Sequence, residues 1–142
     1  MRRKDGKLEL LAAVPVFERW DPQTLRRLGM ITDEAEADAG VTLTRQGRLG
    51  YEFFVIAEGR ARVEIDGHEV ASLGPGSFFG EMALIDGGPR TATVTAESAM
   101  RLYVVDGRSF PTLLVDAPIV ARRLMRTLAE RLRAADQAVT AA

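Results

Sequence analysis

The middle of the chain alternates apolar and polar residues in short runs, a pattern typical of β-strands. Glycine separates these runs at intervals of roughly seven to ten residues between Gly40 and Gly107, as in sheets joined by tight turns. The predicted strands cover 40–44, 51–57, the two arms of a hairpin over 61–73 that turns at Asp66-Gly67, 91–96 and 100–105. Roughly seven or eight short strands of this kind predict a compact β-roll or sandwich.

The segments on either side of these strands carry helix signals instead. Asp21 is a typical N-cap residue, and the proline and leucines that follow predict a helix over about 22–30. Beyond the strands, the sequence predicts a short helix over 109–115 and a longer one from about 118 to at least 137, with Asp116 as its cap.

The longest predicted helix carries one narrow apolar stripe. Its members, which recur every three or four residues, are Ala121, Met125, Leu128, Leu132, Ala135 and Val139. Such a stripe suits packing against the sheet and also suits pairing of two copies of the helix, and the sequence leaves both interpretations open. Five arginines between Arg122 and Arg133 are interpreted as a solvated face, because Glu130 lies between two of them at helical spacing.

Length and composition narrow the functional classes. A chain of 142 residues, 46% of them hydrophobic, has enough apolar mass for one core and not for two full domains. The 19 basic and 20 acidic residues give a net charge of −1, which lacks the positive field that nucleic-acid binding usually requires. No apolar run is long enough to cross a membrane, so we expect a cytoplasmic protein without a nucleic-acid or membrane partner.

Metal and thiol chemistry are also disfavoured. The chain has no cysteine and one histidine, His68, which excludes disulfides, thiol nucleophiles and sites built from several histidines. We therefore expect no metal and no cofactor.

The most informative segment runs from Gly74 to Val94. Gly80 allows close approach of the backbone, residues 81–85 can form one helical turn whose N–H groups face an anion, and Arg90 offers a guanidinium fork to a phosphate. Glu81 would repel a phosphate about 4 Å away by several kcal/mol. A ligand that carries a hydroxyl beside its phosphate resolves this conflict, because the carboxylate can accept the hydroxyl proton.

These residues resemble a known family. Phe79-Gly-Glu-Met-Ala-Leu-Ile and Pro89-Arg-Thr-Ala-Thr-Val are similar to the phosphate-binding cassette of cyclic nucleotide-binding domains. The likeness extends to Val14–Phe17, to Phe54–Gly59 and to the Asp66-Gly67 hairpin. It implies an antiparallel β-roll, resembling a jelly roll, with an N-terminal helix and with C-terminal helices that close over the ligand. The implied layout is one domain over 1–142, with a helical lead-in at 1–33, the roll at 34–106, the cassette at 79–92 and the C-terminal helices at 107–142.

The resemblance also implies a role for each cassette residue. Glu81 would bind the ribose 2′-hydroxyl and Arg90 the cyclic phosphate of cAMP or cGMP. The amide of Ala83 would also bind the phosphate, while Gly80 and Met82 would shape the turn.

Five further positions correspond less directly to the family. Val63 and Val70 would line the base, although ordinary core packing explains them as well. Thr91 can bond the phosphate or a guanine amine, or simply begin a strand; we favour cAMP over cGMP. Ala135 and Asp136 lie where relatives place a residue over the base, but they also suit a solvated helix end.

Together these observations predict a non-catalytic sensor. Its C-terminal helices would move on binding and control a separate effector or a second copy of the chain. The alternative is a degenerate scaffold in which Glu81 and Arg90 form an internal ion pair and no nucleotide binds. An enzyme on the same frame is disfavoured, because the sequence offers no recognisable nucleophile, base and orienting group.

Overall fold

The computed structural model describes residues 3–14, 17, 20–81, 87–116 and 118–141. The helices are α1 (Arg3–Ala13), α2 (Pro22–Met30), α3 (Phe110–Asp116) and α4 (Pro118–Ala141). The strands are β1 (Thr32–Ala37), β2 (Thr42–Thr44), β3 (Glu52–Glu58), β4 (Ala61–Ile65), β5 (His68–Leu73), β6 (Phe78–Phe79), β7 (Thr93–Ala96) and β8 (Met100–Asp106).

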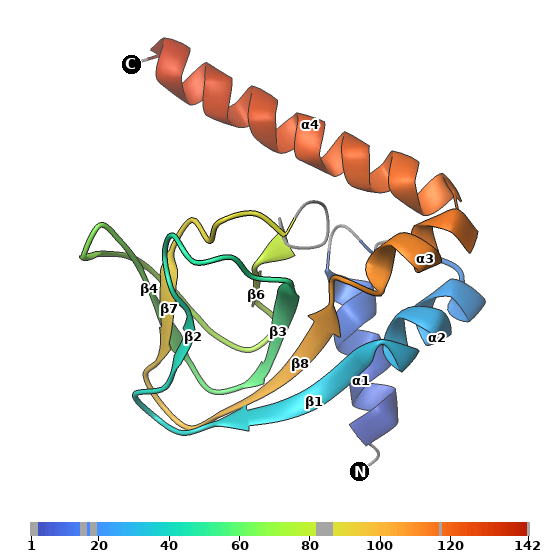
Figure 1. The fold of residues 1–142 in the computed structure, drawn as a ribbon, viewed down its shortest axis with the longest axis horizontal. Coiled ribbons are helices and arrows are strands. Elements are labelled where there is room, and N and C mark those ends of the chain that lie inside the picture. The colour runs from blue at the N-terminus through green and yellow to red at the C-terminus, as the bar shows by residue number, and fades with distance from the viewer. Residues whose placement is uncertain (1–2, 15–16, 18–19, 82–86, 117, 142) are drawn as a thin grey trace.

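The strands form two four-stranded antiparallel sheets. One sheet has the order β1-β8-β3-β6 and the other the order β2-β7-β4-β5. The two sheets form a roll, while α1, α2 and α3 gather at one end of it (Figure 1). This arrangement confirms the predicted antiparallel β-roll with flanking helices.

Two apolar clusters stabilise this arrangement, and β3 contributes to both. Phe53 and Val55 pack with α1, α2 and α3 on one side of β3, whereas Phe54 and Ile56 pack between the sheets. Because successive side chains of a strand point to opposite faces, the buried run in β3 serves both clusters. The roll and the helical end are therefore joined through the same strand.

Several local predictions are confirmed by their geometry. Asp21 caps α2, since its side chain accepts a hydrogen bond from the backbone N–H of Thr24 at 3.2 Å. The hairpin turns at Asp66 and Gly67, both with positive φ, at 53° and 81°. Positive φ at both central residues is the requirement of the tight turn that Asp-Gly favours.

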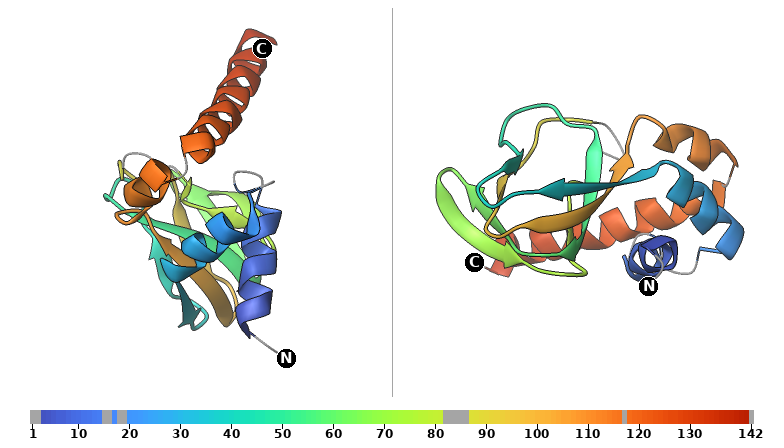
Figure 2. Two further views of the ribbon diagram at one scale, coloured as in Figure 1. Left: turned by 90° about the vertical axis from the view of Figure 1, so that its right-hand side faces the viewer. Right: turned by 90° about the horizontal axis from the view of Figure 1, so that it is seen from below.

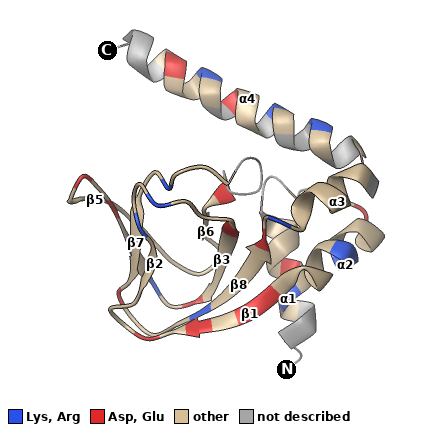
Figure 3. Ribbon diagram, viewed as in Figure 1, with Lys and Arg blue, Asp and Glu red and all other residues tan. Residues whose placement is uncertain are grey.

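Two strands were not predicted. β1 has the sequence TDEAEA, and its acidic residues have a low propensity for strands. It pairs along its whole length with β8 at the sheet edge. Acidic residues recur along this edge strand (Figure 3). The other unpredicted strand, β6, has only two residues and pairs with β3. Both strands are stabilised by their neighbours more than by their own composition.

The long helix α4 projects away from the rest of the chain (Figure 2). Of its apolar stripe, Leu128 packs against the cluster that joins the helices to β3. Met125 and Leu132 are 63% and 66% exposed. Part of the stripe therefore packs on the body, and part of it is open to solvent.

Candidate functional site

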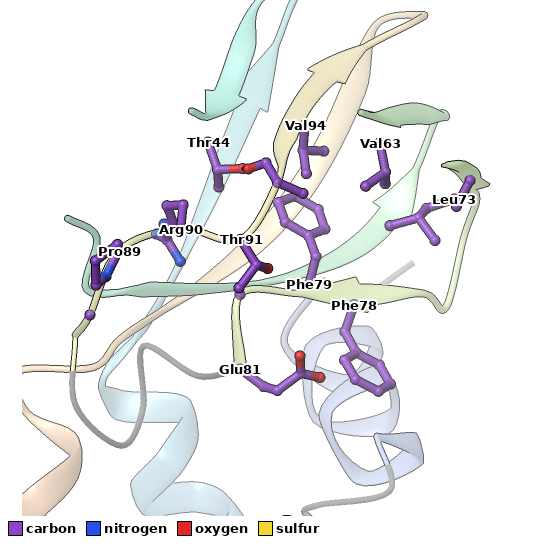
Figure 4. A pocket seen from close by; sticks show the side chains of 14 residues that line it. Thr44, Val63, Leu73, Phe78, Phe79, Glu81, Pro89, Arg90, Thr91 and Val94 are labelled. Carbon is purple, nitrogen blue, oxygen red and sulfur yellow. The ribbon is translucent and has the colours of Figure 1, made fainter. Parts of the chain in front are cut away.

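A hollow of about 270 Å³ opens inside the roll, beside the cassette (Figure 4). The predicted residues that line it are Val63, Gly80, Glu81, Arg90 and Thr91. The structure thus brings together residues from β4, from the end of β6 and from the segment that precedes β7.

Arg90 is held at this hollow by both its backbone and its side chain. The segment 47–49 runs antiparallel to 89–90, where Arg90 N donates to Arg48 O and Gly47 N donates to Arg90 O, both at 2.8 Å. The guanidinium Nη1 donates to the backbone carbonyl of Glu52 at 2.9 Å, and Nη2 lies 3.5 Å from the Glu52 carboxylate. The arginine side chain is only 9% exposed.

Two glycines make room for this guanidinium. A methyl group at Gly80 would lie 2.8 Å from Arg90 Nη1 and 2.9 Å from Glu52 O, and one at Gly50 would overlap the arginine outright. Gly80 also has a φ of +83°, which other residues adopt only with strain. The glycine at the start of the cassette is therefore required by space and by backbone conformation.

Burial shapes the electrostatics of the site. Desolvation lowers the pKa of the Arg90 guanidinium below its usual value, whereas attraction to Glu52 acts in the opposite direction. Arginine remains protonated even so, because its ordinary pKa lies far above neutral pH. The hollow therefore contains a largely buried positive charge.

Glu81 occupies a different part of the pocket. Its side chain extends away from Arg90 and toward Phe78 in Figure 4. The carboxylate that pairs with Arg90 belongs instead to Glu52, a residue that the sequence pattern did not single out. The acidic and basic groups of the cassette can thus contact separate groups of one ligand.

The wall of the hollow beyond these charged groups is apolar. It is formed by Val63, Ala71, Leu73, Phe79 and Val94. Thr44, which sequence reasoning missed, lines the same pocket and donates its hydroxyl to the carbonyl of Ala92 at 3.1 Å. A flat apolar ring would find contacts along this wall.

Val70 does not line the pocket and is 56% exposed. Its neighbours Glu69 and Ala71 pair with the consecutive residues Glu64 and Val63 on β4. Val70 is therefore the extra residue of a β-bulge, which turns its side chain outward.

The remaining predicted residues lie elsewhere. Ala135 and Asp136 are exposed on α4 and do not line the pocket. Met82 and Ala83 lie outside the described residues.

Two larger hollows, of about 540 and 510 Å³, border α2 and share Met30. They contain none of the predicted site residues, so the smaller hollow is the better candidate. Among the described residues, no group of three metal-binding side chains occurs. None of the described helices combines the length and the apolar character that crossing a membrane requires.

Residues 34–116 match the family model of the cyclic nucleotide-binding domain. The chain belongs to the cyclic nucleotide-binding domain family. This match includes the whole cassette and confirms the resemblance noted in the sequence.

Proteins similar to this cyclic nucleotide-binding domain include a channel and two regulatory proteins. A cyclic nucleotide-gated potassium channel from Rhizobium etli is 39% identical over 136 residues, which cover 92% of this chain and 37% of the channel. The N-terminal domain of a transcriptional regulator from Streptomyces coelicolor A3(2) has a TM-score of 0.79 at 32% identity, covering 92% of this chain and 94% of that one. The regulatory domain of Toxoplasma gondii PKA, crystallised with cAMP, has a TM-score of 0.73 at 31% identity, covering 81% and 46%. The chain therefore spans 37% of the length of the curated channel that it matches.

Proposed function

We propose that this domain binds a cyclic nucleotide, cAMP in preference to cGMP, as a non-catalytic sensor. One observation carries the proposal: the buried guanidinium of Arg90 shares a pocket with the carboxylate of Glu81 and an apolar wall. A cyclic nucleotide presents a phosphate, a ribose hydroxyl and a flat base, which match these three features.

In this proposal, each residue has one role. Arg90 binds the cyclic phosphate, together with the amide of Ala83, and Glu81 accepts the hydrogen bond of the ribose 2′-hydroxyl. Gly80 and Met82 shape the turn, and Val63 contacts the base.

The preference for cAMP has two supports. The apolar wall formed by Val63, Ala71, Leu73, Phe79 and Val94 has no side-chain group that could accept a hydrogen bond from a guanine amine, so a guanine placed against it would leave that amine without a partner there. The structurally similar domain from T. gondii was crystallised with cAMP.

We further propose that binding alters the position of the C-terminal helices. The phosphate would draw the cassette inward, and α4 would repack so that Ala135 and Asp136 approach the base. The output would reach an effector in trans, or a second copy of the chain through the exposed Met125 and Leu132. We assign the whole chain, 1–142, to this one binding domain.

Calorimetric titration with cAMP and cGMP tests the proposal. Wild type should give saturable heat with cAMP and weaker binding with cGMP. Arg90→Ala should lose about 10- to 150-fold in affinity for each charge-assisted bond removed, since each is worth about 1.5–3 kcal/mol. Arg62→Ala is the matched control, because it removes the same charge from β4, where Arg62 pairs with Glu64 outside the pocket lining.

Each alternative function has a distinct outcome in this experiment. A protein-binding scaffold would give no saturable heat with either nucleotide. An enzyme would convert the nucleotide during incubation. Because we propose a non-catalytic domain, chromatography after incubation should return cAMP unchanged. Unaltered affinity in Arg90→Ala would refute the assignment of the phosphate site.

A further inference from the structure

Tyr51 lies between the cassette and the segment 107–108, which leads into α3. It directly precedes β3 and is 43% exposed. Its ring lies against Gly87, within the cassette, while its carbonyl accepts a hydrogen bond from Gly107 N at 2.7 Å. The guanidinium of Arg108 lies over the same ring, 5.7 Å from its centroid.

The ring of Tyr51 is tightly packed against Gly87 of the cassette. A methyl group at Gly87 would lie 2.6 Å from Tyr51 Cε1 and 2.7 Å from Cδ1, so the ring is in direct contact with the glycine backbone. Gly87 is three residues from Arg90 in the chain. Closely packed groups transmit displacement because they cannot interpenetrate, so a shift of Gly87 must displace the ring or be resisted by it.

The ring also contacts Arg108, which lies two residues before the start of α3. Arg108 bonds the side chain of Asp106 through its backbone N–H at 2.9 Å and through Nε at 3.3 Å. The hydroxyl of Ser109 donates to the same carboxylate at 3.4 Å. Phe110 follows as the first residue of α3 and is fully buried.

The neighbours of Tyr51 in the chain belong to the Arg90 site itself. Gly50 leaves the space that the guanidinium fills, and Glu52 supplies both of its described acceptors. Gly50, Tyr51 and Glu52 thus contact Arg90, the cassette and the segment that leads into α3.

We propose that Tyr51 is a positioning residue that couples the Arg90 cassette to α3, so that ligand binding alters the packing of α3 through its ring. This inference rests on the proposed function, because it requires that a cyclic nucleotide binds at Arg90. It assigns no contact between Tyr51 and the ligand.

The chain contains its own reporter for α3. Trp20 is the one tryptophan in the sequence and is 7% exposed. Its ring stacks on Phe110 of α3, with centroids 6.5 Å apart and an interplanar angle of 22°. Among the described atoms, its Nε1 has no hydrogen-bond partner, so its emission depends on packing around it. Movement of α3 should therefore change Trp20 emission.

The test measures cAMP affinity by calorimetry and Trp20 emission at saturation, with selective excitation of tryptophan. Tyr51→Ala should bind cAMP at least as tightly as wild type. Without the ring, none of the binding free energy is needed to rearrange the packing of α3. Its emission change should fall to less than half of the wild-type change. Tyr51→Phe is the matched control and should behave as wild type, because it keeps the ring.

Arg108→Ala is a second variant that should fold, since its side chain is 70% exposed. It should also reduce the emission change, whereas Arg108→Lys keeps a cation over the ring and should restore it. These variants decide the question even if Tyr51→Ala is unfolded.

Three results would overturn the coupling role while leaving nucleotide binding intact. They are a full emission change in Tyr51→Ala and Arg108→Ala, binding by wild type without any change in Trp20 emission, and weakened binding in Tyr51→Ala with the emission change retained. Absence of saturable heat in wild type is a different failure, because it refutes the proposed function itself.

Discussion

In the proposed complex, Glu52 would compete with the phosphate of cAMP for Arg90, so neutralising Glu52 should tighten cAMP binding. The Glu52 carboxylate lies 3.5 Å from Arg90 Nη2. Glu52→Gln removes the negative charge but leaves the backbone carbonyl that accepts from Nη1 at 2.9 Å. The arginine should then remain in place with a weaker internal partner.

The size of the effect depends on how strongly water screens this pair. Coulomb's law at 3.5 Å gives about 5 kcal/mol at an effective dielectric of 20 and about 1.2 kcal/mol in bulk water. The Glu52 side chain is 51% exposed, which favours the screened limit. Measured exposed pairs contribute about 0.2–1 kcal/mol, so the expected gain in affinity is about 1.4- to 5-fold.

Calorimetric titration with cAMP at low and high salt measures this gain. The matched control is Glu58→Gln, on the same strand, which removes an equal charge from the pair with Arg101 at 3.1 Å. Arg101 does not line the pocket, so affinity should not change in the control. At about 1 M salt the screening length falls to about 3 Å, and the gain from Glu52→Gln should shrink.

Equal or weaker binding by Glu52→Gln than by both wild type and the control would refute the competition. A gain of the same size at high salt would also refute it, because the cause would then not be electrostatic.

Three further predictions test other parts of the structure. Gly80→Ala should destabilise the chain by about 1–2 kcal/mol through its positive φ and weaken cAMP binding through contact with Arg90, as measured by thermal unfolding and calorimetry. The backbone N–H of Arg108 lowers the pKa of Asp106 below 3.8, so its stabilisation is present above that pH and lost as pH falls through the lowered value. Asp106→Asn should therefore make the melting temperature decrease less as the pH falls, which a series of melting curves at different pH values measures. Leu132→Glu should convert a dimer formed through α4 to monomer in sedimentation without loss of melting temperature, because this side chain is 66% exposed.

Local sequence signals predicted the parts of the fold that local chemistry determines. The Asp-Gly pair predicted the hairpin between β4 and β5, and Asp21 predicted the start of α2. The cassette pattern also brought Gly80, Glu81 and Arg90 to one pocket. In each case the residue type itself restricts the backbone or carries the charge.

Contacts between distant segments could not be predicted in the same way. Glu52 contacts Arg90 across 38 positions, and nothing in its own neighbourhood marks it as an acceptor. The outward turn of Val70 depends on a bulge in the pairing of β4 with β5, and one residue of register reverses the face of a side chain. β1 is a strand because β8 pairs with it.

The environment of Arg90 also argues against a purely structural role for this residue. A buried charge is costly unless it is closely paired, and a structural arginine is expected to face a close carboxylate. Here the arginine side chain is 9% exposed, yet its described hydrogen-bond acceptors are the neutral carbonyl of Glu52 and its half-exposed carboxylate at 3.5 Å, with the centroid of the Phe54 ring 5.8 Å from the guanidinium. The pocket that Arg90 lines has a volume of about 270 Å³, which is large enough to admit an anion. An anionic ligand would therefore relieve a cost that the folded chain leaves only partly compensated, which favours the sensor over the scaffold.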